Sequence, residues 1–158
     1  MNKFKRKLIA LLLLVTMIIP VLATPVKIDA ASKVSKSTQV ITLAKKQLGK
    51  KYVWGKSGSS TFDCSGFTYY VIKNTTGKTI PRSSTAQGQY GKYVSRKSLK
   101  KGDLVFFATT GTRKISHAGI YIGSNKFIHA SSTKGKVVIS SMASGHYYKT
   151  FVNGRRVI

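Results

Sequence analysis

Two spacings of apolar residues alternate along the chain, one typical of helices and the other of strands. From the candidate caps Ser37 and Thr38 to a stop at Gly49, apolar residues recur every three or four positions. Helical spacing returns at Cys64 and ends within 74–77. The pattern predicts two amphipathic helices in the first half of the chain. Their apolar faces comprise Val40, Ile41, Leu43, Ala44 and Leu48 in the first helix, and Phe67, Tyr70 and Val71 in the second.

Small and turn-forming residues mark the connections. Residues 52–55 lead into a loop rich in glycine and serine over 58–60. Residues 81–84 predict a turn, after which Ser84 can cap a short helix that runs through Gln89.

The second half of the chain predicts about five short strands. A turn at 123–125 joins two of them as a hairpin, and a Gly102-Asp103 turn precedes another. Helices followed by consecutive strands predict an α+β domain with a short-stranded antiparallel sheet. The strands are expected at 104–107, 117–122, 126–130, 137–139 and 151–157.

The first thirty residues have the features of a targeting segment. Four basic residues lie within 1–7, no charge occurs over 8–26, and small residues follow between Ala23 and Ala31. This order predicts a secretory signal peptide over 1–30, cleaved between Ala23 and Ala31. The alternative is a membrane anchor, which needs about 20 consecutive apolar residues. Two prolines and two threonines make this stretch a poor span, so no stable membrane span is expected after processing.

The balance of charge excludes several chemistries. The chain has 28 Lys and Arg against 3 Asp and no Glu, and without residues 1–30 it keeps 23 basic and two acidic residues, a formal charge of +21. A glycosidase pair, a calcium loop and a two-metal site all need more carboxylates. The single cysteine excludes an internal disulfide and a cysteine-rich zinc site. After a polar lead-in over 31–37, residues 38–158 are long enough to form one domain with its own core.

So strong a positive charge indicates a polyanionic partner. Self-repulsion at +21 destabilises a compact domain, so solubility alone is a weaker explanation. An exported protein meets anionic cell-wall polymers and an anionic membrane face, and wall polymers are the expected partner. Nucleic acid could bind through its phosphates, but without specific recognition of sequence.

Cys64 is the candidate nucleophile. It has polar neighbours and begins a helix, whose positive end favours the thiolate, although a buried structural cysteine is the alternative. The predicted hairpin places His117 and His129 at the same end of adjacent strands, so His117 can take the thiol proton while His129 orients its ring. A zinc ion held by these three residues is a second interpretation. His146 is expected to be an ordinary structural or surface histidine.

Six short blocks of this sequence resemble those of the NlpC-type family of cell-wall cysteine peptidases. They occur in the family's order and together cover essentially all of 38–157. The blocks are Tyr52-Val53-Trp54-Gly55, Asp63-Cys64-Ser65-Gly66-Phe67, Pro81-Arg82-Ser83-Ser84, 102–107, 117–123 and 127–130.

The resemblance implies a reduced papain-like α+β fold in which the helix that begins at Cys64 packs on an antiparallel sheet. It implies that Cys64 is the nucleophile, His117 the general base and His129 the third, orienting residue. The implied reaction is hydrolysis of the bond between D-glutamate and a diamino acid in peptidoglycan stem peptides, without a cofactor or metal. The positions that match the family's substrate groove are Tyr52, Asp63, Ser65 and Ser83.

Two features depart from the family pattern. Its Tyr-x-x-Gly-Gly segment ends here in Gly55-Lys56, and no wall-binding repeat or companion domain is recognisable.

The leading hypothesis is a secreted, wall-associated endopeptidase for remodelling or lysis. The alternatives are a wall amidase, a peptidase for another D-amino-acid polymer, and a non-catalytic polyanion-binding secreted protein.

Overall fold

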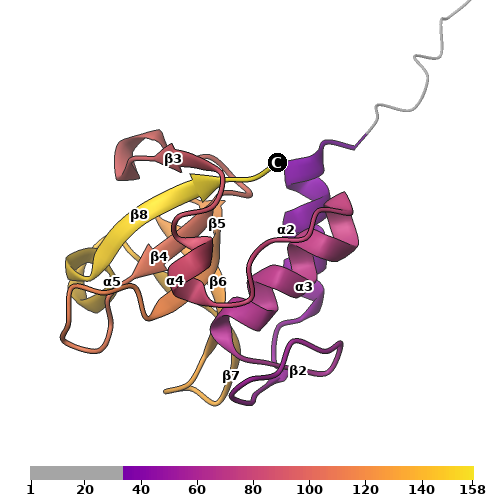
Figure 1. Cartoon of the computed structure of the whole chain (residues 1–158), viewed down its shortest axis with the longest axis horizontal. Coiled ribbons are helices and arrows are strands. Elements are labelled where there is room, and N and C mark those ends of the chain that lie inside the picture. The colour runs from indigo at the N-terminus through magenta and orange to yellow at the C-terminus, as the bar shows by residue number, and fades with distance from the viewer. Residues whose placement is uncertain (1–33) are drawn as a thin grey trace, which may run out of the picture. The chain divides into compact units, whose positions relative to one another are not determined.

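Two helices lie against one side of a mixed β-sheet in the computed structural model, which describes residues 34–158 (Figure 1). The predicted signal peptide over 1–30 lies outside the described residues. The helices α2 (Lys36–Lys46) and α3 (Cys64–Thr76) pack on each other, and α3 also packs on the middle of the sheet. The family resemblance therefore predicted the class of fold correctly.

The first helix begins earlier than its sequence predicted. Ser35 caps α2 by accepting the Thr38 backbone N–H at 3.2 Å, so the expected caps Ser37 and Thr38 are wrong. Three hydroxyl residues within four positions can each cap a helix, and packing selects among them. Leu48, expected on the apolar face, lies beyond the helix and is 40% exposed.

The second helix has the predicted ends. It begins at Cys64, and Gly77 ends it in the left-handed region, at φ 73°, with its backbone N–H bonded to the Lys73 carbonyl. This is the conformation that favours glycine after a helix.

The sheet has eight strands in the described part of the chain, in the order β2-β1-β7-β6-β5-β4-β8-β3. Five were predicted; the three that were not predicted are only two or three residues long, too short to show a period. All neighbours are antiparallel except the edge pair β1 and β2, which corrects the purely antiparallel expectation. The strands are β1 (Lys51–Tyr52), β2 (Thr61–Phe62), β3 (Lys92–Val94), β4 (Leu104–Phe107), β5 (His117–Gly123), β6 (Lys126–Ser131), β7 (Lys136–Ser141) and β8 (Phe151–Arg156).

Apolar side chains cover both faces of the interior strand β4, which explains its continuous Leu-Val-Phe-Phe sequence. Leu104 and Phe106 join the core beneath α2 and α3. Val105 and Phe107 face the other way, into a smaller cluster that Tyr147 of α5 (Gly145–Lys149) helps to cover. The β5–β6 hairpin turns at Ser124 and Asn125, with φ of 51° and 52°, as expected for a two-residue turn of primed type.

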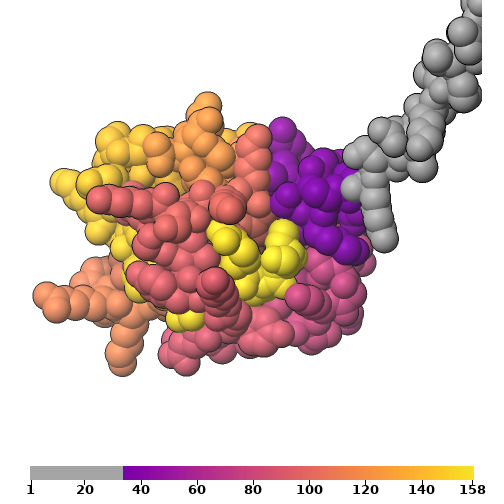
Figure 2. All heavy atoms as spheres, turned by 90° about the horizontal axis from the view of Figure 1, so that it is seen from above, coloured from indigo at the N-terminus to yellow at the C-terminus, as the bar shows by residue number. Residues whose placement is uncertain are grey.

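The C-terminal residues close the top of the domain. Figure 2 shows them, in yellow, exposed between segments from the first and the middle parts of the chain. The Lys78 ammonium donates to the Val157 carbonyl at 2.7 Å, which links this end to the segment after α3. Within residues 34–158, no helix has the length and apolarity needed to cross a membrane.

Candidate active site

The site begins where a loop crosses the first turn of α3. The Asp63 carboxylate caps this helix by accepting the Gly66 backbone N–H at 2.6 Å. The Asp63 backbone N–H donates to the Lys56 carbonyl at 2.8 Å, and a Cβ at position 66 would lie 2.1 Å from that same oxygen. Glycine at position 66 therefore allows the close approach of the loop, which holds the buried Cys64 in place as the first residue of α3.

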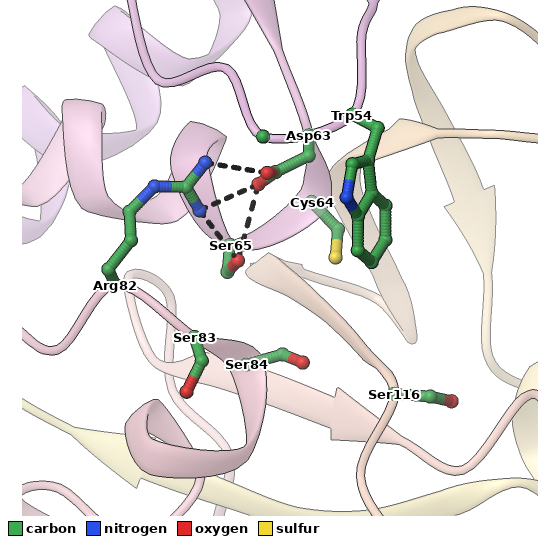
Figure 3. A pocket seen from close by; sticks show the side chains of 9 residues that line it. Trp54, Asp63, Cys64, Ser65, Arg82, Ser83, Ser84 and Ser116 are labelled. Carbon is green, nitrogen blue, oxygen red and sulfur yellow. Dashed lines mark hydrogen bonds and ion pairs between the residues drawn. The ribbon is translucent and has the colours of Figure 1, made fainter.

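Arg82 joins two of the predicted substrate-binding residues into one network (Figure 3). Its guanidinium donates to both carboxylate oxygens of Asp63, at 2.9 and 2.5 Å, and to the Ser65 hydroxyl at 3.0 Å. The hydrogen bond with Asp63 raises the pKa of Arg82, so this group stays charged. A two-point ion pair of this kind fixes the orientation of both groups next to Cys64.

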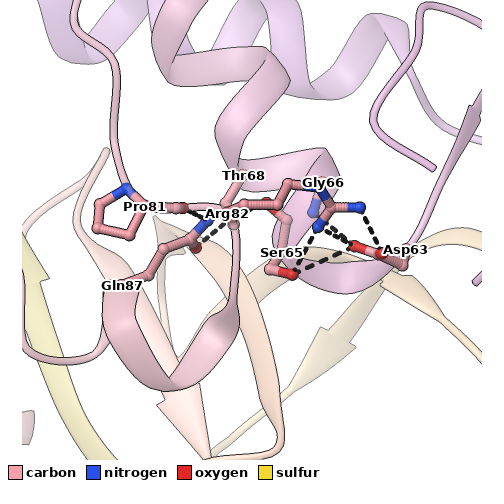
Figure 4. Close-up of polar contacts among 7 residues, drawn as sticks. All are labelled: Asp63, Ser65, Gly66, Thr68, Pro81, Arg82 and Gln87. Atoms are coloured by element: carbon pink, nitrogen blue, oxygen red, sulfur yellow. Dashed lines mark hydrogen bonds and ion pairs between the residues drawn. The ribbon is translucent and has the colours of Figure 1, made fainter. Parts of the chain in front are cut away.

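Gln87 connects the Arg82 segment to α3 (Figure 4). Its amide, fully buried, donates to the carbonyls of Ser65 and Pro81 at 3.0 and 2.8 Å and accepts from the Thr68 hydroxyl at 2.6 Å. Gln87 is the last residue of α4 (Ser84–Gln87), which ends two residues earlier than predicted. Its cap is Ser83, whose hydroxyl accepts the Ala86 backbone N–H, rather than the expected Ser84.

A cavity of about 350 Å³ opens beside this network (Figure 3). It brings together three of the four predicted substrate-binding residues with the thiol of Cys64, and Trp54, 82% exposed, stands at its rim. The fourth, Tyr52 in β1, is half-buried and is not part of the lining, but the charges of Cys64 and Asp63 add to burial in raising its pKa. The principal lining residues are Trp54, Asp63, Cys64, Ser65, Arg82 and Ser83.

The two predicted histidines meet through a direct hydrogen bond. His117 Nε2 and His129 Nδ1 are 2.7 Å apart, and His129 Nε2 lies 2.9 Å from the Ser140 hydroxyl on β7. The register of β5 and β6 places Gly119, rather than His117, opposite His129, so the pair is diagonal across the two strands. Gly119 leaves room for three neighbouring residues of β6, because a Cβ there would lie 2.6 Å from the Phe127 ring, 2.9 Å from the Ile128 carbonyl oxygen and 3.2 Å from the Cβ of His129.

Cys64 lies against the start of β5, next to this pair. The backbone N–H of Ala118, the residue after His117, is directed at its sulfur. Burial and, to a smaller extent, the charge of Asp63 raise the pKa of the Cys64 thiol by more than the N–H groups of Ala118, Ser65 and Cys64 lower it. The expectation that the helix end favours the thiolate is therefore outweighed by desolvation. Among the described residues no hydrogen bond joins this sulfur to the His117 ring.

Burial also keeps both histidines neutral. Desolvation lowers the pKa of His117 to about 4 and that of His129 to about 3. A neutral His117 that accepts a proton at Nδ1 must carry its hydrogen on Nε2 and donate it to His129 Nδ1. His129 then carries its own hydrogen on Nε2 and donates it to Ser140. For His117 to act as a base through Nδ1, the three side chains must therefore adopt this arrangement of protons, with Nδ1 of His117 as the free acceptor.

This arrangement also bears on the zinc interpretation. His117 Nε2 and His129 Nδ1 are occupied by each other, so these two nitrogens are not available to a metal ion. Within residues 34–158, no three His, Cys, Asp or Glu side chains are grouped so that they could hold one.

Four residues of the site were not singled out from the sequence. Arg82 and Gln87 lie in a segment predicted only as a turn and a short helix, and Ser140 lies on a strand among other serines. Tyr147 packs on the His117 ring, at 6.1 Å between ring centres, and shields the histidine pair from one side. The sequence offered a signal only for Arg82, an arginine within a block that resembles the family.

Residues 49–156 match the NlpC/P60 family, and the chain belongs to this family. It is 39% identical over 133 residues to the murein DD-endopeptidase MepH of Escherichia coli, covering 80% of this chain and 48% of that protein. It is 41% identical over 128 residues to the gamma-DL-glutamyl hydrolase of Bacillus subtilis, covering 80% of this chain and 30% of that protein. The chain thus spans half or less of the length of these two relatives.

Solved structures of NlpC/P60 proteins have the same fold as this chain. An NlpC/P60 family protein from Bacillus cereus superposes with a TM-score of 0.71 at 36% identity, over 76% of this chain and 39% of that one. The NlpC/p60 domain of the peptidoglycan hydrolase SagA superposes with a TM-score of 0.66 at 30% identity, over 77% of this chain and 98% of that one. The described domain therefore corresponds to nearly the whole of an isolated NlpC/P60 domain.

Proposed function

We propose that residues 38–158 form an exported cysteine endopeptidase that hydrolyses peptidoglycan stem peptides at the bond between D-glutamate and a diamino acid, in wall remodelling or lysis. The observation that carries this proposal is the position of Cys64 at the start of α3, against the strand that begins with the hydrogen-bonded His117. Family membership and relatives named as murein endopeptidases support it.

In the proposed mechanism, His117 Nδ1 takes the thiol proton as the sulfur attacks the amide carbonyl. His129 keeps the His117 ring in the tautomer that leaves Nδ1 free. The backbone N–H of Cys64, assisted by the Tyr52 hydroxyl, stabilises the negative oxygen; such a donor contributes about 2.7–4 kcal/mol in comparable enzymes. Protonated His117 gives its proton to the departing amine, and then activates the water that releases the acyl group from the sulfur.

The cavity beside Cys64 is proposed to hold the acyl half of the substrate. Arg82 supplies a fixed positive charge, and Ser65 and Ser83 supply hydroxyl groups. D-Glutamate linked through its side chain keeps a free α-carboxylate, which can bind the N–H groups of Arg82 that Asp63 and Ser65 leave free. Asp63 keeps the guanidinium in position, and Trp54 provides an exposed flat surface at the rim.

A second candidate is hydrolysis of another polymer that contains D-glutamate. The 41% identity to a protein named gamma-DL-glutamyl hydrolase favours it. The same residues would perform the same acyl transfer, and only the leaving group would differ.

Export and wall binding complete the proposal. A signal peptide over 1–30 and a secreted, wall-associated location are proposed from the sequence. The described residues carry 22 Lys and Arg against two aspartates, a formal charge of +20, and both aspartates are paired with arginines. The positively charged surface of the domain is proposed to bind anionic wall polymers.

Digestion of purified peptidoglycan, with the products identified by mass spectrometry, tests the proposed bond. Fragments ending in D-glutamate and fragments beginning with a free diamino acid are the expected products. Products of DD-endopeptidase cleavage alone, the activity that the name of MepH gives for that protein, would overturn the assignment of the bond. Release from poly-γ-glutamate but not from peptidoglycan would establish the second candidate.

A further inference from the structure

A second cavity, of about 320 Å³, opens beside His117. His117 lines this cavity and Cys64 does not, whereas Cys64 lines the first cavity and His117 does not. Most of its other lining is hydroxyl groups, from Thr109 and Thr110 and from the segment 131–133. We call it the hydroxyl cavity.

The sheet explains why these segments meet. Strands β4 and β6 both run antiparallel to β5, so the residues that follow them lie at the edge where β5 begins with His117. The helix α5 completes the lining of the hydroxyl cavity with His146 and Tyr147. His117 is therefore surrounded by the ends of two strands and one short helix.

The chemistry of acyl transfer assigns a side to each half of a substrate. The acyl half stays bonded to the sulfur of Cys64, whereas the departing amine receives its proton from His117. The first cavity therefore holds the acyl half, and the hydroxyl cavity holds the leaving group.

The lining of the hydroxyl cavity lacks any carboxylate. Of the two aspartates among the described residues, Asp63 is paired with Arg82 and Asp103 with Arg156, and neither lines this cavity. An ammonium group placed there would find no carboxylate partner, within a domain of formal charge +20. A carboxylate would find hydroxyl donors and the His146 ring, which lies at the exposed rim.

We propose that the hydroxyl cavity is the leaving-group subsite, and that it selects a leaving diamino acid with a free carboxylate on its side chain. This inference rests on the proposed function, because it needs a leaving amine next to His117. Two diamino acids of peptidoglycan make a matched pair for it, since meso-diaminopimelate differs from L-lysine by one carboxylate at the end of the side chain.

The test compares two synthetic peptides, L-Ala-γ-D-Glu-X-D-Ala, in which X is meso-diaminopimelate or L-lysine. The purified protein is expected to cleave the diaminopimelate peptide with a kcat/KM about tenfold higher, the size of effect that one charge-assisted hydrogen bond produces. His146→Ala should reduce this ratio mainly by raising KM for the diaminopimelate peptide. Thr133→Asp, which adds a carboxylate to the rim, should shift the ratio towards the lysine peptide.

Lys149→Ala is the matched control, because it removes a positive charge from α5 outside the hydroxyl cavity and should leave the ratio unchanged. Equal kcat/KM values for the two peptides, or a ratio that neither His146→Ala nor Thr133→Asp changes, would overturn the subsite while leaving the peptidase intact. Failure to cleave either peptide would overturn the proposed function, and the subsite with it.

Discussion

Burial acts in opposite directions on the two residues at the centre of the site. It raises the pKa of the Cys64 thiol and lowers that of His117 to about 4, so both groups are neutral at neutral pH. Proton transfer between them separates charge in a buried place, and groups that stabilise the resulting imidazolium or thiolate therefore control the rate. His129 and Ser140 are the residues positioned to do so on the histidine side.

Removing these partners in turn should give a graded loss of activity. His129→Ala is expected to lower kcat by roughly a hundredfold or more, but less than Cys64→Ala, because the loss of orientation leaves the base itself in place. Ser140→Ala should lower kcat about threefold to tenfold with little change in KM, since one neutral hydrogen bond contributes about 1 kcal/mol. Ser140→Thr keeps the hydroxyl and should restore the rate. Steady-state kinetics on a stem peptide measure all four variants, and wild-type kcat in His129→Ala would remove His129 from the mechanism.

The two buried histidines should also make stability depend on pH. Their pKa values are lowered to about 4 and about 3, from 6.5, so below pH 6.5 the unfolded chain binds protons that the folded chain does not. The free energy of unfolding therefore decreases as the pH falls from 6.5 towards 4. Between pH 7 and pH 5 each histidine should account for about 2 kcal/mol of this decrease.

Urea unfolding of wild type and His129→Asn at the two pH values measures this effect. The variant retains a polar side chain but has one buried titrating ring fewer, and it should lose about half of the histidine-dependent decrease. An unchanged difference between pH 7 and pH 5 would show that His129 does not titrate as its burial requires.

At the scale of elements, α3 and the loop before it position Cys64, the proposed nucleophile. Gly66→Ala would place a Cβ 2.1 Å from the Lys56 carbonyl, so either the loop or the helix start must shift. We expect a loss of about 1–3 kcal/mol in the free energy of unfolding, and a larger relative loss of activity because Cys64 moves with the helix. Gly58→Ala is the control, since its Cβ would meet no atom within 4 Å. Equal stability and activity of the two variants, by urea unfolding and peptide hydrolysis, would contradict this role for Gly66.

The elements differ in how far the sequence predicted them. The start of α3, its end at Gly77 and the β5–β6 hairpin were predicted because caps and turn residues act locally. The strands β1 to β3 were not, because two or three residues carry no period and such strands form only against a neighbour. The position of the histidine pair was predicted in outline, but its diagonal register follows from how β5 and β6 pair, with Gly119 leaving room for the neighbouring residues of β6. The contacts of Gln87 and Ser140 join segments distant in sequence, and no local pattern encodes them.

At the scale of the whole molecule, charge is the dominant feature. With a formal charge of +20 on the described residues, binding to anionic wall material should weaken steeply between about 50 and 200 mM salt, as expected when bound counterions are released. Wild type and Cys64→Ala should elute from isolated walls at the same salt concentration, because the thiol does not contribute to this binding. Elution of both proteins already at low salt would contradict wall targeting by charge.

The central claim is that Cys64 is the nucleophile of a wall peptidase. Its most direct test is the release of stem-peptide fragments from peptidoglycan by wild type and Cys64→Ala, in amounts adjusted so that equal quantities of the two proteins are bound to the wall. The account predicts release by the wild type and none by the variant. Equal release by both proteins, or binding without release by either, would contradict it.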